Sequence, residues 1–154
     1  MDTWYISPKR ISDLEAEAAA WLGTPFRENS AVRGLGGGVS CHNLVAELYF
    51  ATGCLERFVV PTGSARSLRH GPANAMLDYL DAQLAGRFAA VPDASPEKIM
   101  PGDMLAISDG RNVLHVGVAL LGGRFVHVLK GTGVMVSMLR DSTYKITAAR
   151  RPLP

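Results

Sequence analysis

The 154-residue chain has only two cysteines, a nearly balanced charge and no long apolar run. Two thiols are too few for a disulfide framework or a four-cysteine zinc site. No stretch of eighteen consecutive apolar residues occurs, so no helix is predicted to span a membrane. Sixteen basic against fourteen acidic residues leave a net charge of +2, which is too balanced for a dedicated nucleic-acid-binding protein.

The composition is that of a folded domain rich in turns. Hydrophobic residues make up 47% of the chain and charged residues 19%, which argues against disorder. A domain of this size buries enough surface to fold without a disulfide or a metal. Sixteen glycines and nine prolines predict many tight turns. The N-terminus has no apolar run of signal-peptide length, so we expect a soluble protein that is cytoplasmic as synthesised, with non-classical release as another route.

Apolar residues recur at helical spacing in the first half of the chain. Three helices are predicted, at about 8–22, 40–53 and 72–84. Residues 24–40 are expected to form a loop, and residues 54–70 are expected to be irregular.

After Gly86 the pattern changes to short segments separated by turns. Strands are predicted at 87–91, 104–107, 114–121, 124–129, 134–138 and 144–149, with a Pro-rich linker at 92–101 and a turn at Asp109-Gly110. Helices followed by an antiparallel sheet define an α+β fold, in one domain spanning residues 1–154.

Cys41 is the strongest candidate for a reactive residue. It follows a glycine-rich loop and opens the second predicted helix. The free amides and partial positive charge of a helix N-terminus favour thiolate over thiol and can bind an oxyanion. The competing interpretation is a buried cysteine that packs as a small hydrophobe. Cys54, about 20 Å away at the other end of that helix, is too distant for a disulfide and is expected to be structural.

A thiol nucleophile needs a base and a group that orients it, and the four histidines are the candidates. In the strand at 114–121, alternation places His115 on the same face as small residues. His127 lies in the next predicted strand. A two-residue turn at Gly122-Gly123 would put the two histidines on opposite faces, whereas a three-residue loop or a bulge would put them on the same face. The sequence leaves both registers open.

The other two histidines are weaker candidates. His42 follows Cys41 on the helix and points about 100° away, so it is a poor base and is interpreted as a substrate or surface contact. His70 is interpreted as a turn residue. The spacing of Cys41 and the histidines matches no compact zinc pattern, so no metal and no cofactor are expected.

The order of these features resembles the NlpC/P60 family of papain-like cysteine peptidases, with phage-associated cell-wall peptidases as the nearest likeness. The resemblance covers nearly the whole chain. It rests on the segments Trp21-Leu22-Gly23-Thr24-Pro25-Phe26, Cys41 with Leu44-Val45, Pro101-Gly102-Asp103-Met104-Leu105, His115-Val116-Gly117-Val118 and Gly123-Arg124-Phe125-Val126-His127.

The resemblance implies a triad with Cys41 as nucleophile, His115 as base and His127 as the residue that orients His115. It therefore implies the register in which both histidines share a face. Members of the family mostly cleave amide bonds in the peptide stems of bacterial cell wall, so a peptidoglycan stem peptide is the implied substrate. The position of Phe26, with that of His42, is implied to contact substrate.

Two departures from the family pattern bear on activity. Family members usually have Asp-Cys-Ser-Gly around the nucleophile, where this chain has Ser40-Cys41-His42-Asn43, and they commonly have Tyr where Phe26 stands. Phe26 has no hydroxyl to donate. The leading interpretation is an NlpC/P60-like cysteine endopeptidase. The alternatives are a non-catalytic binding or structural module of a phage tail-like particle, and a thiol acyltransferase or amidase acting on a non-wall substrate.

Overall fold

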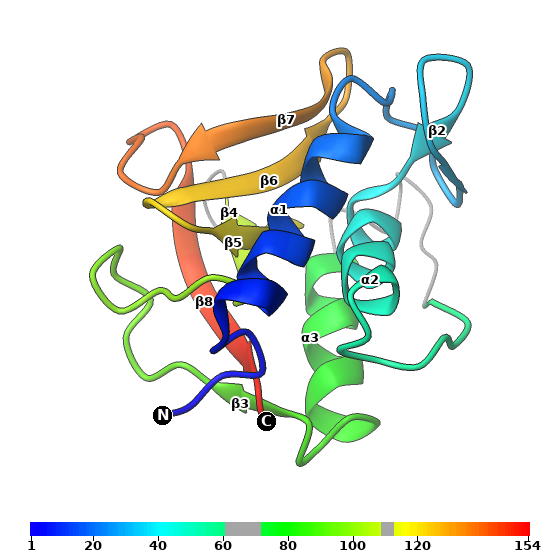
Figure 1. The fold of residues 1–154 in the computed structure, drawn as a ribbon. Coiled ribbons are helices and arrows are strands. Elements are labelled where there is room, and N and C mark those ends of the chain that lie inside the picture. The colour runs from blue at the N-terminus through cyan, green and yellow to red at the C-terminus, as the bar shows by residue number, and fades with distance from the viewer. Residues whose placement is uncertain (61–71, 109–112) are drawn as a thin grey trace.

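The computed structural model describes residues 1–60, 72–108 and 113–154. Figure 1 shows helices packed beside a twisted sheet. In chain order the elements are α1 (Pro8–Trp21), β1 (Ala31–Val32), β2 (Gly38–Val39), α2 (Cys41–Ala51), α3 (Pro72–Ala82), β3 (Phe88–Ala90), β4 (Met104–Ser108), β5 (Val113–Leu120), β6 (Arg124–Leu129), β7 (Gly133–Met138) and β8 (Lys145–Pro152). The predicted α+β class is confirmed.

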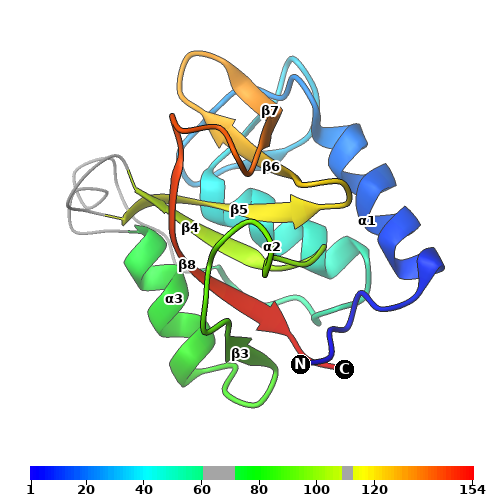
Figure 2. The same cartoon turned by 90° about the vertical axis from the view of Figure 1, so that its left-hand side faces the viewer.

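Six strands form one antiparallel sheet in the order β3-β8-β4-β5-β6-β7. The three helices pack on one face of this sheet (Figures 1 and 2). Alternation divides the sheet residues between two apolar clusters. Val116, Val118 and Val126 join the helices in the larger cluster, whereas Ala119 and Phe125 belong to a smaller cluster on the opposite face.

The first helix begins where the sequence predicts. The Ser7 side chain accepts a hydrogen bond from the Arg10 amide, and a proline occupies the first turn. The helix buries Leu14, Ala18 and Trp21, which recur every three or four residues. Glu15 on the same helix accepts hydrogen bonds from the Leu121 amide and the Arg124 guanidinium. This contact ties α1 to the turn between β5 and β6.

The segment predicted as a loop at 24–40 contains a short hairpin, β1 with β2, in which Ala31 pairs with Val39 and Val32 with Gly38. The glycine run allows the two strands to approach closely. A Cβ at Gly37 would lie 2.0 Å from the carbonyl oxygen of Val32, so no other residue fits there without moving the backbone. This contact accounts for glycine at position 37.

Several predicted boundaries differ from the observed ones by one to three residues, and the segments at 61–71 and 109–112 lie outside the described residues. The last strand continues to Pro152 instead of Ala149, because Arg150, Arg151 and Pro152 pair with β3. The third helix ends at Ala82 instead of residue 84. The predicted turn at Asp109-Gly110, His70 and most of the irregular segment at 54–70 fall in the two undescribed stretches.

The two ends of the chain lie side by side at the end of β8 (Figure 1), where the Trp4 amide donates to the carbonyl oxygen of Pro152. In the described part of the chain, no helix combines the length and apolar character needed to cross a membrane.

Candidate active site

The N-terminus of α2 is capped by two side chains from the Ser40-Cys41-His42-Asn43 segment. Ser40 is the N-cap, and its hydroxyl accepts hydrogen bonds from the backbone amide of Asn43 at 3.4 Å and from Nδ2 of Asn43 at 2.8 Å. A cap of this kind satisfies amides that the first helical turn leaves free. The helix therefore starts at Cys41, as the sequence predicts. Ser40 and Asn43, which both depart from the family pattern, therefore have a structural role, because together they cap the helix.

Cys41 lies at the first helical position, against the sheet. Its side chain is buried, and burial raises the pKa of the Cys41 thiol to about 11, while the backbone amides of Val116, His42 and Cys41 itself oppose the rise. The amides at the start of α2 favour the thiolate, as expected, but they do not determine the net shift of the thiol pKa. Desolvation of the charged form outweighs the helix amides here. The Val116 amide belongs to β5 and directly follows His115, so the thiol contacts this strand beside the candidate base.

His42 is buried, with 3% of its surface exposed, and Nδ1 of its ring lies 3.5 Å from Sγ of Cys41. The interpretation of His42 as a surface contact is therefore wrong. The apolar packing of α2 against the sheet encloses this ring as well as the thiol. Burial lowers the pKa of His42 to about 4, so the ring is neutral at pH 7. A neutral ring supplies no positive charge to stabilise a thiolate.

The turn between β5 and β6 determines how the two other histidines are placed. Leu120 pairs with Arg124, which leaves the three residues Leu121, Gly122 and Gly123 in the turn. Both glycines have positive φ values, 78° and 71°. Of the two registers that the sequence leaves open, the one with a three-residue loop is observed. It places His115 and His127 on the same face of the sheet, as the family resemblance implied.

His115 and His127 are in direct contact. Nε2 of His115 lies 3.1 Å from Nδ1 of His127, and the two rings stack with their planes 10° apart. His127 is fully buried, and burial together with the nearby His115 lowers the pKa of His127 to about 3. A neutral His127 can accept a hydrogen bond from His115. This is the geometry that an orienting residue needs.

Two further residues at His127 were not found from the sequence. The hydroxyl of Ser137, on β7, lies 2.8 Å from Nε2 of His127. The ring of Tyr144 meets His127 edge to face, with centroids 4.9 Å apart. Ser137 lies ten residues after His127, and only the register of β6 with β7 brings the two side chains together. No sequence motif marks this serine.

Phe26 lies next to the segment that leads into α2. It forms an isolated parallel bridge with Val39, two residues before Cys41, and it is half-buried against the core. The Arg27 amide donates to the carbonyl oxygen of Val39, and the Val39 amide donates to that of Pro25. Phe26 is thus held beside Val39, which precedes the nucleophile candidate by two residues.

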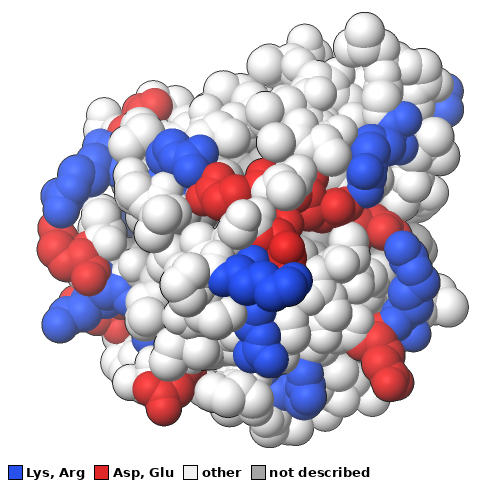
Figure 3. All heavy atoms as spheres, in the orientation of Figure 1, with Lys and Arg blue, Asp and Glu red and all other residues white. Residues whose placement is uncertain are grey.

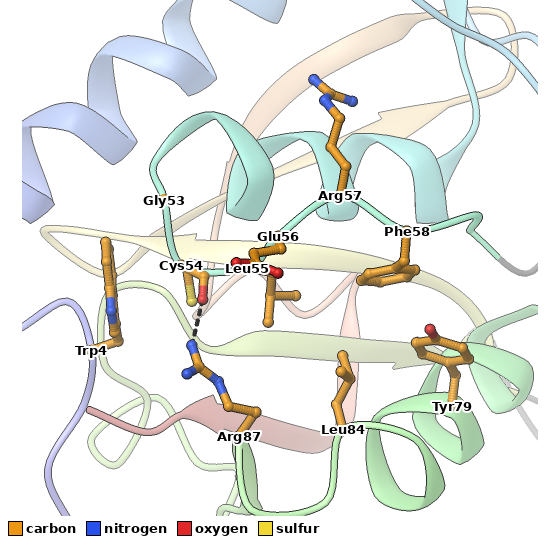
Figure 4. Close-up of a pocket in the computed structure, with 10 residues that line it drawn as sticks. All are labelled: Trp4, Gly53, Cys54, Leu55, Glu56, Arg57, Phe58, Tyr79, Leu84 and Arg87. Atoms are coloured by element: carbon orange, nitrogen blue, oxygen red, sulfur yellow. Dashed lines mark hydrogen bonds between the residues drawn. The ribbon is translucent and has the colours of Figure 1, made fainter.

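Cys54 is free and buried beyond the C-terminal end of α2, the end opposite Cys41. Burial raises the pKa of the Cys54 thiol to about 12. A pocket of about 590 Å³ lies beside it, with Trp4 on one side and Phe58 and Tyr79 on another (Figure 4). The Arg87 guanidinium donates to the carbonyl oxygen of Cys54 there. No predicted site residue lines this pocket.

On the face seen in Figure 1, Lys and Arg are interspersed with Asp and Glu (Figure 3). Among the described residues, no three His, Cys, Asp or Glu side chains are grouped so that they could hold a metal ion.

The fold is papain-like, and solved structures of NlpC/P60 proteins share it. A lipoprotein-like NLP/P60 protein from Staphylococcus aureus matches with a TM-score of 0.63 and 19% identity, over 100% of this chain and 45% of that one. The NlpC/P60 domain of the peptidoglycan hydrolase SagA matches with a TM-score of 0.52 and 18% identity, over 93% of this chain and 98% of that one.

A third neighbour is RipD from Mycobacterium tuberculosis, a non-catalytic NlpC/P60 domain protein adapted to peptidoglycan binding. It matches with a TM-score of 0.54 and 16% identity, over 96% of this chain and 100% of that one. No protein-family model and no curated protein matches the sequence. The chain thus has the NlpC/P60 fold, and it spans less than half the length of the S. aureus protein.

Proposed function

We propose that the chain is a cysteine hydrolase that cleaves an amide bond in the peptide stems of bacterial cell wall. The observation that carries this proposal is the 3.1 Å contact between Nε2 of His115 and Nδ1 of His127. His115 lies on β5, and the next residue of that strand, Val116, presents its backbone amide to the Cys41 thiol. A nucleophile, a base and an orienting group thus come from α2, β5 and β6 in the order of the papain-like triad.

The raised pKa of Cys41 determines how such an enzyme would start its reaction. The resting thiol is protonated, so His115 acts as a general base during attack. Nδ1 of His115 takes the thiol proton as sulfur bonds to the carbonyl carbon, and amides at the start of α2 bind the oxyanion. His115 then gives the proton to the leaving amine as the C–N bond breaks. Water hydrolyses the resulting thioester and restores the thiol.

The proposed substrate class is supported by the neighbours. SagA is a peptidoglycan hydrolase, and RipD is adapted to peptidoglycan binding. Phe26 borders the substrate near the start of α2. His42 influences substrate binding indirectly, because its ring contacts the Cys41 thiol that the substrate approaches. Phe26 contributes apolar contact only, because its ring has no hydroxyl to donate to the oxyanion.

The test is hydrolysis of purified peptidoglycan or soluble muropeptides, followed by chromatography and mass spectrometry of the products. Cys41→Ala and His115→Ala are expected to abolish turnover. Cys54→Ala is the matched control, because it removes the other buried thiol at the opposite end of α2. Full activity in Cys41→Ala or in His115→Ala would refute the mechanism.

His127→Ala should reduce the rate without abolishing it, because the base would remain but would lose its orientation. A fall in kcat of roughly 10- to 100-fold is expected, within the usual contribution of general-base catalysis. A loss as complete as that of Cys41→Ala would show that His127, and not His115, is the base. The kcat of the three variants on one muropeptide decides this.

A second function is a non-catalytic module that binds peptidoglycan. The observation that favours it is the buried, protonated Cys41, together with the likeness to RipD. Sedimentation with purified cell-wall sacculi tests it. Two results together would favour this binding module over the hydrolase. The Cys41→Ala variant would still bind sacculi, and the wild-type protein would release no muropeptide from them.

A further inference from the structure

His127 has a hydrogen-bond partner at each ring nitrogen. Nδ1 lies 3.1 Å from Nε2 of His115, and Nε2 lies 2.8 Å from the hydroxyl oxygen of Ser137. The His127 side chain has no exposed surface, and Ser137 is 8% exposed. Phe125 and Tyr144 cover the ring with their own rings. Both partners of His127 therefore come from the protein.

Only two proton arrangements keep both hydrogen bonds when the two imidazoles are neutral. A neutral imidazole has one N–H donor and one acceptor nitrogen. In the first arrangement His115 donates from Nε2 to Nδ1 of His127, and His127 donates from its own Nε2 to Ser137. In the second, Ser137 donates to His127, which then donates from Nδ1 to His115. Burial lowers the pKa of His127 to about 3, so its ring stays neutral near pH 7.

The two arrangements have opposite consequences for His115. In the first, His115 has its proton on Nε2, and Nδ1 is the basic nitrogen that can accept a proton from Cys41. In the second, Nε2 of His115 accepts a hydrogen bond, so the neutral ring has its proton on Nδ1. That nitrogen then cannot take up the thiol proton. The direction of the hydrogen bond at Ser137 therefore decides whether His115 can act as the base.

We propose that Ser137 is a positioning residue that accepts a hydrogen bond from Nε2 of His127 and thereby keeps His115 able to accept a proton at Nδ1. The proposal deepens the proposed function, because it rests on His115 as the base. The pairing of β6 with β7 fixes the position of Ser137. Six residue pairs set the register of β6 with β7, including His127 with Met135 and Phe125 with Ser137. This register puts Ser137 diagonally across from His127, on the same face.

The experiment measures the tautomer of His127 directly in the full-length protein. The protein is labelled with ¹⁵N-histidine, and two-bond ¹H–¹⁵N correlation spectra at pH 7 show which ring nitrogen has the proton. The His127 signals are assigned by their loss in His127→Asn. We expect His127 with its proton on Nε2 in the wild type and in Ser137→Thr, which keeps a hydroxyl. Ser137→Ala should increase the population with the proton on Nδ1.

Activity provides the second readout. In Ser137→Ala, kcat on muropeptides should fall about tenfold with KM unchanged, whereas Ser137→Thr should retain most of the wild-type kcat. Thr147→Ala is the matched control. It removes a hydroxyl from β8 of the same sheet, where that hydroxyl donates to the carbonyl oxygen of Ala106. Its kcat and its His127 tautomer should equal those of the wild type.

The results separate this inference from the proposed function. A wild-type His127 with its proton on Nδ1 would overturn the role of Ser137 even in an active enzyme, and so would an unchanged tautomer in Ser137→Ala. The wild-type and Ser137→Thr spectra decide the matter if Ser137→Ala does not fold. The tautomer requires no substrate, whereas absence of Cys41-dependent hydrolysis in the wild type would overturn the proposed function itself.

Discussion

The sulfur of Cys41 lies 3.5 Å from Nδ1 of the His42 ring, and both side chains are buried. Burial raises the pKa of the thiol to about 11 and lowers that of the imidazole to about 4. Both groups are therefore neutral at pH 7. The enclosure of this pair, more than the helix N-terminus, controls the reactivity of the resting thiol.

Replacing His42 with alanine should make Cys41 more reactive. Loss of the ring admits water to the thiol, so its pKa falls, and each unit of fall increases the thiolate fraction about tenfold. His42→Phe is the control, because it keeps the space filled without a ring nitrogen. Alkylation by iodoacetamide at pH 7, in a Cys54→Ala background, should be about tenfold faster in His42→Ala than in the wild type. Equal rates in the Ala and Phe variants would show that burial by this ring is not the cause.

Gly117 should be intolerant of any side chain. A Cβ there would lie 2.7 Å from the carbonyl oxygen of Val126 and 3.2 Å from Cβ of His127. Gly117→Ala should therefore cost about 1–3 kcal/mol in the free energy of unfolding and separate His115 from His127. Gly36→Ala is the control, because a Cβ there has nothing within 4 Å. Urea unfolding and muropeptide turnover of the two variants check this, and equal stability would contradict it.

The buried ion pair between Asp103 and Arg151 should be essential for stability. Arg151 donates from Nε and an η nitrogen to the two carboxylate oxygens of Asp103, at 2.9 and 2.7 Å, and both residues are buried. Asp103→Ala leaves a buried guanidinium unpaired and should cost about 3–5 kcal/mol. Asp13→Ala, which breaks the exposed pair with Lys9, should cause no measurable loss. Similar midpoints of thermal unfolding for the two variants would refute this.

Acid should destabilise the protein through His127. Its pKa is lowered from an ordinary value of 6.5 to about 3, so between these values the unfolded chain binds a proton that the folded protein does not. The free energy of unfolding therefore falls as the pH falls from 6.5 toward 3, by up to about 1.4 kcal/mol per pH unit. His127→Gln, which cannot titrate, should lose less stability than the wild type between pH 7 and pH 5. Identical losses in urea unfolding would contradict the assignment.

The helices and the nucleophile candidate follow from local sequence signals. Ser7 with Pro8 marks the start of α1, and Ser40 marks the start of α2. These signals act within one helical turn, so they can be read without tertiary contacts. The strands are also marked by alternation and glycine turns, although β8 continues further than predicted because its end pairs with β3.

The relation between His115 and His127 could not be derived from the residues of the two strands. Gly122-Gly123 permits either register, because glycine adopts positive φ readily in turns of both lengths. In the folded protein Leu120 pairs with Arg124, and Glu15 of α1 holds the Leu121 amide and the Arg124 guanidinium. A side chain more than a hundred residues away thus contacts this turn. The resemblance to NlpC/P60 proteins pointed to the right register, whereas the local pattern did not.

The sequence by itself determined the α+β order, the start of the second helix at the nucleophile candidate Cys41 and the pair of histidines on neighbouring strands. Each of these depends on capping, periodicity or turn residues, which operate over a few positions. Tertiary structure alone decided that Cys41 and His42 are enclosed and neutral, and that Ser137 reaches His127. Burial and strand register arise from packing between elements distant in the chain, so the protonation of the site depends on the whole fold.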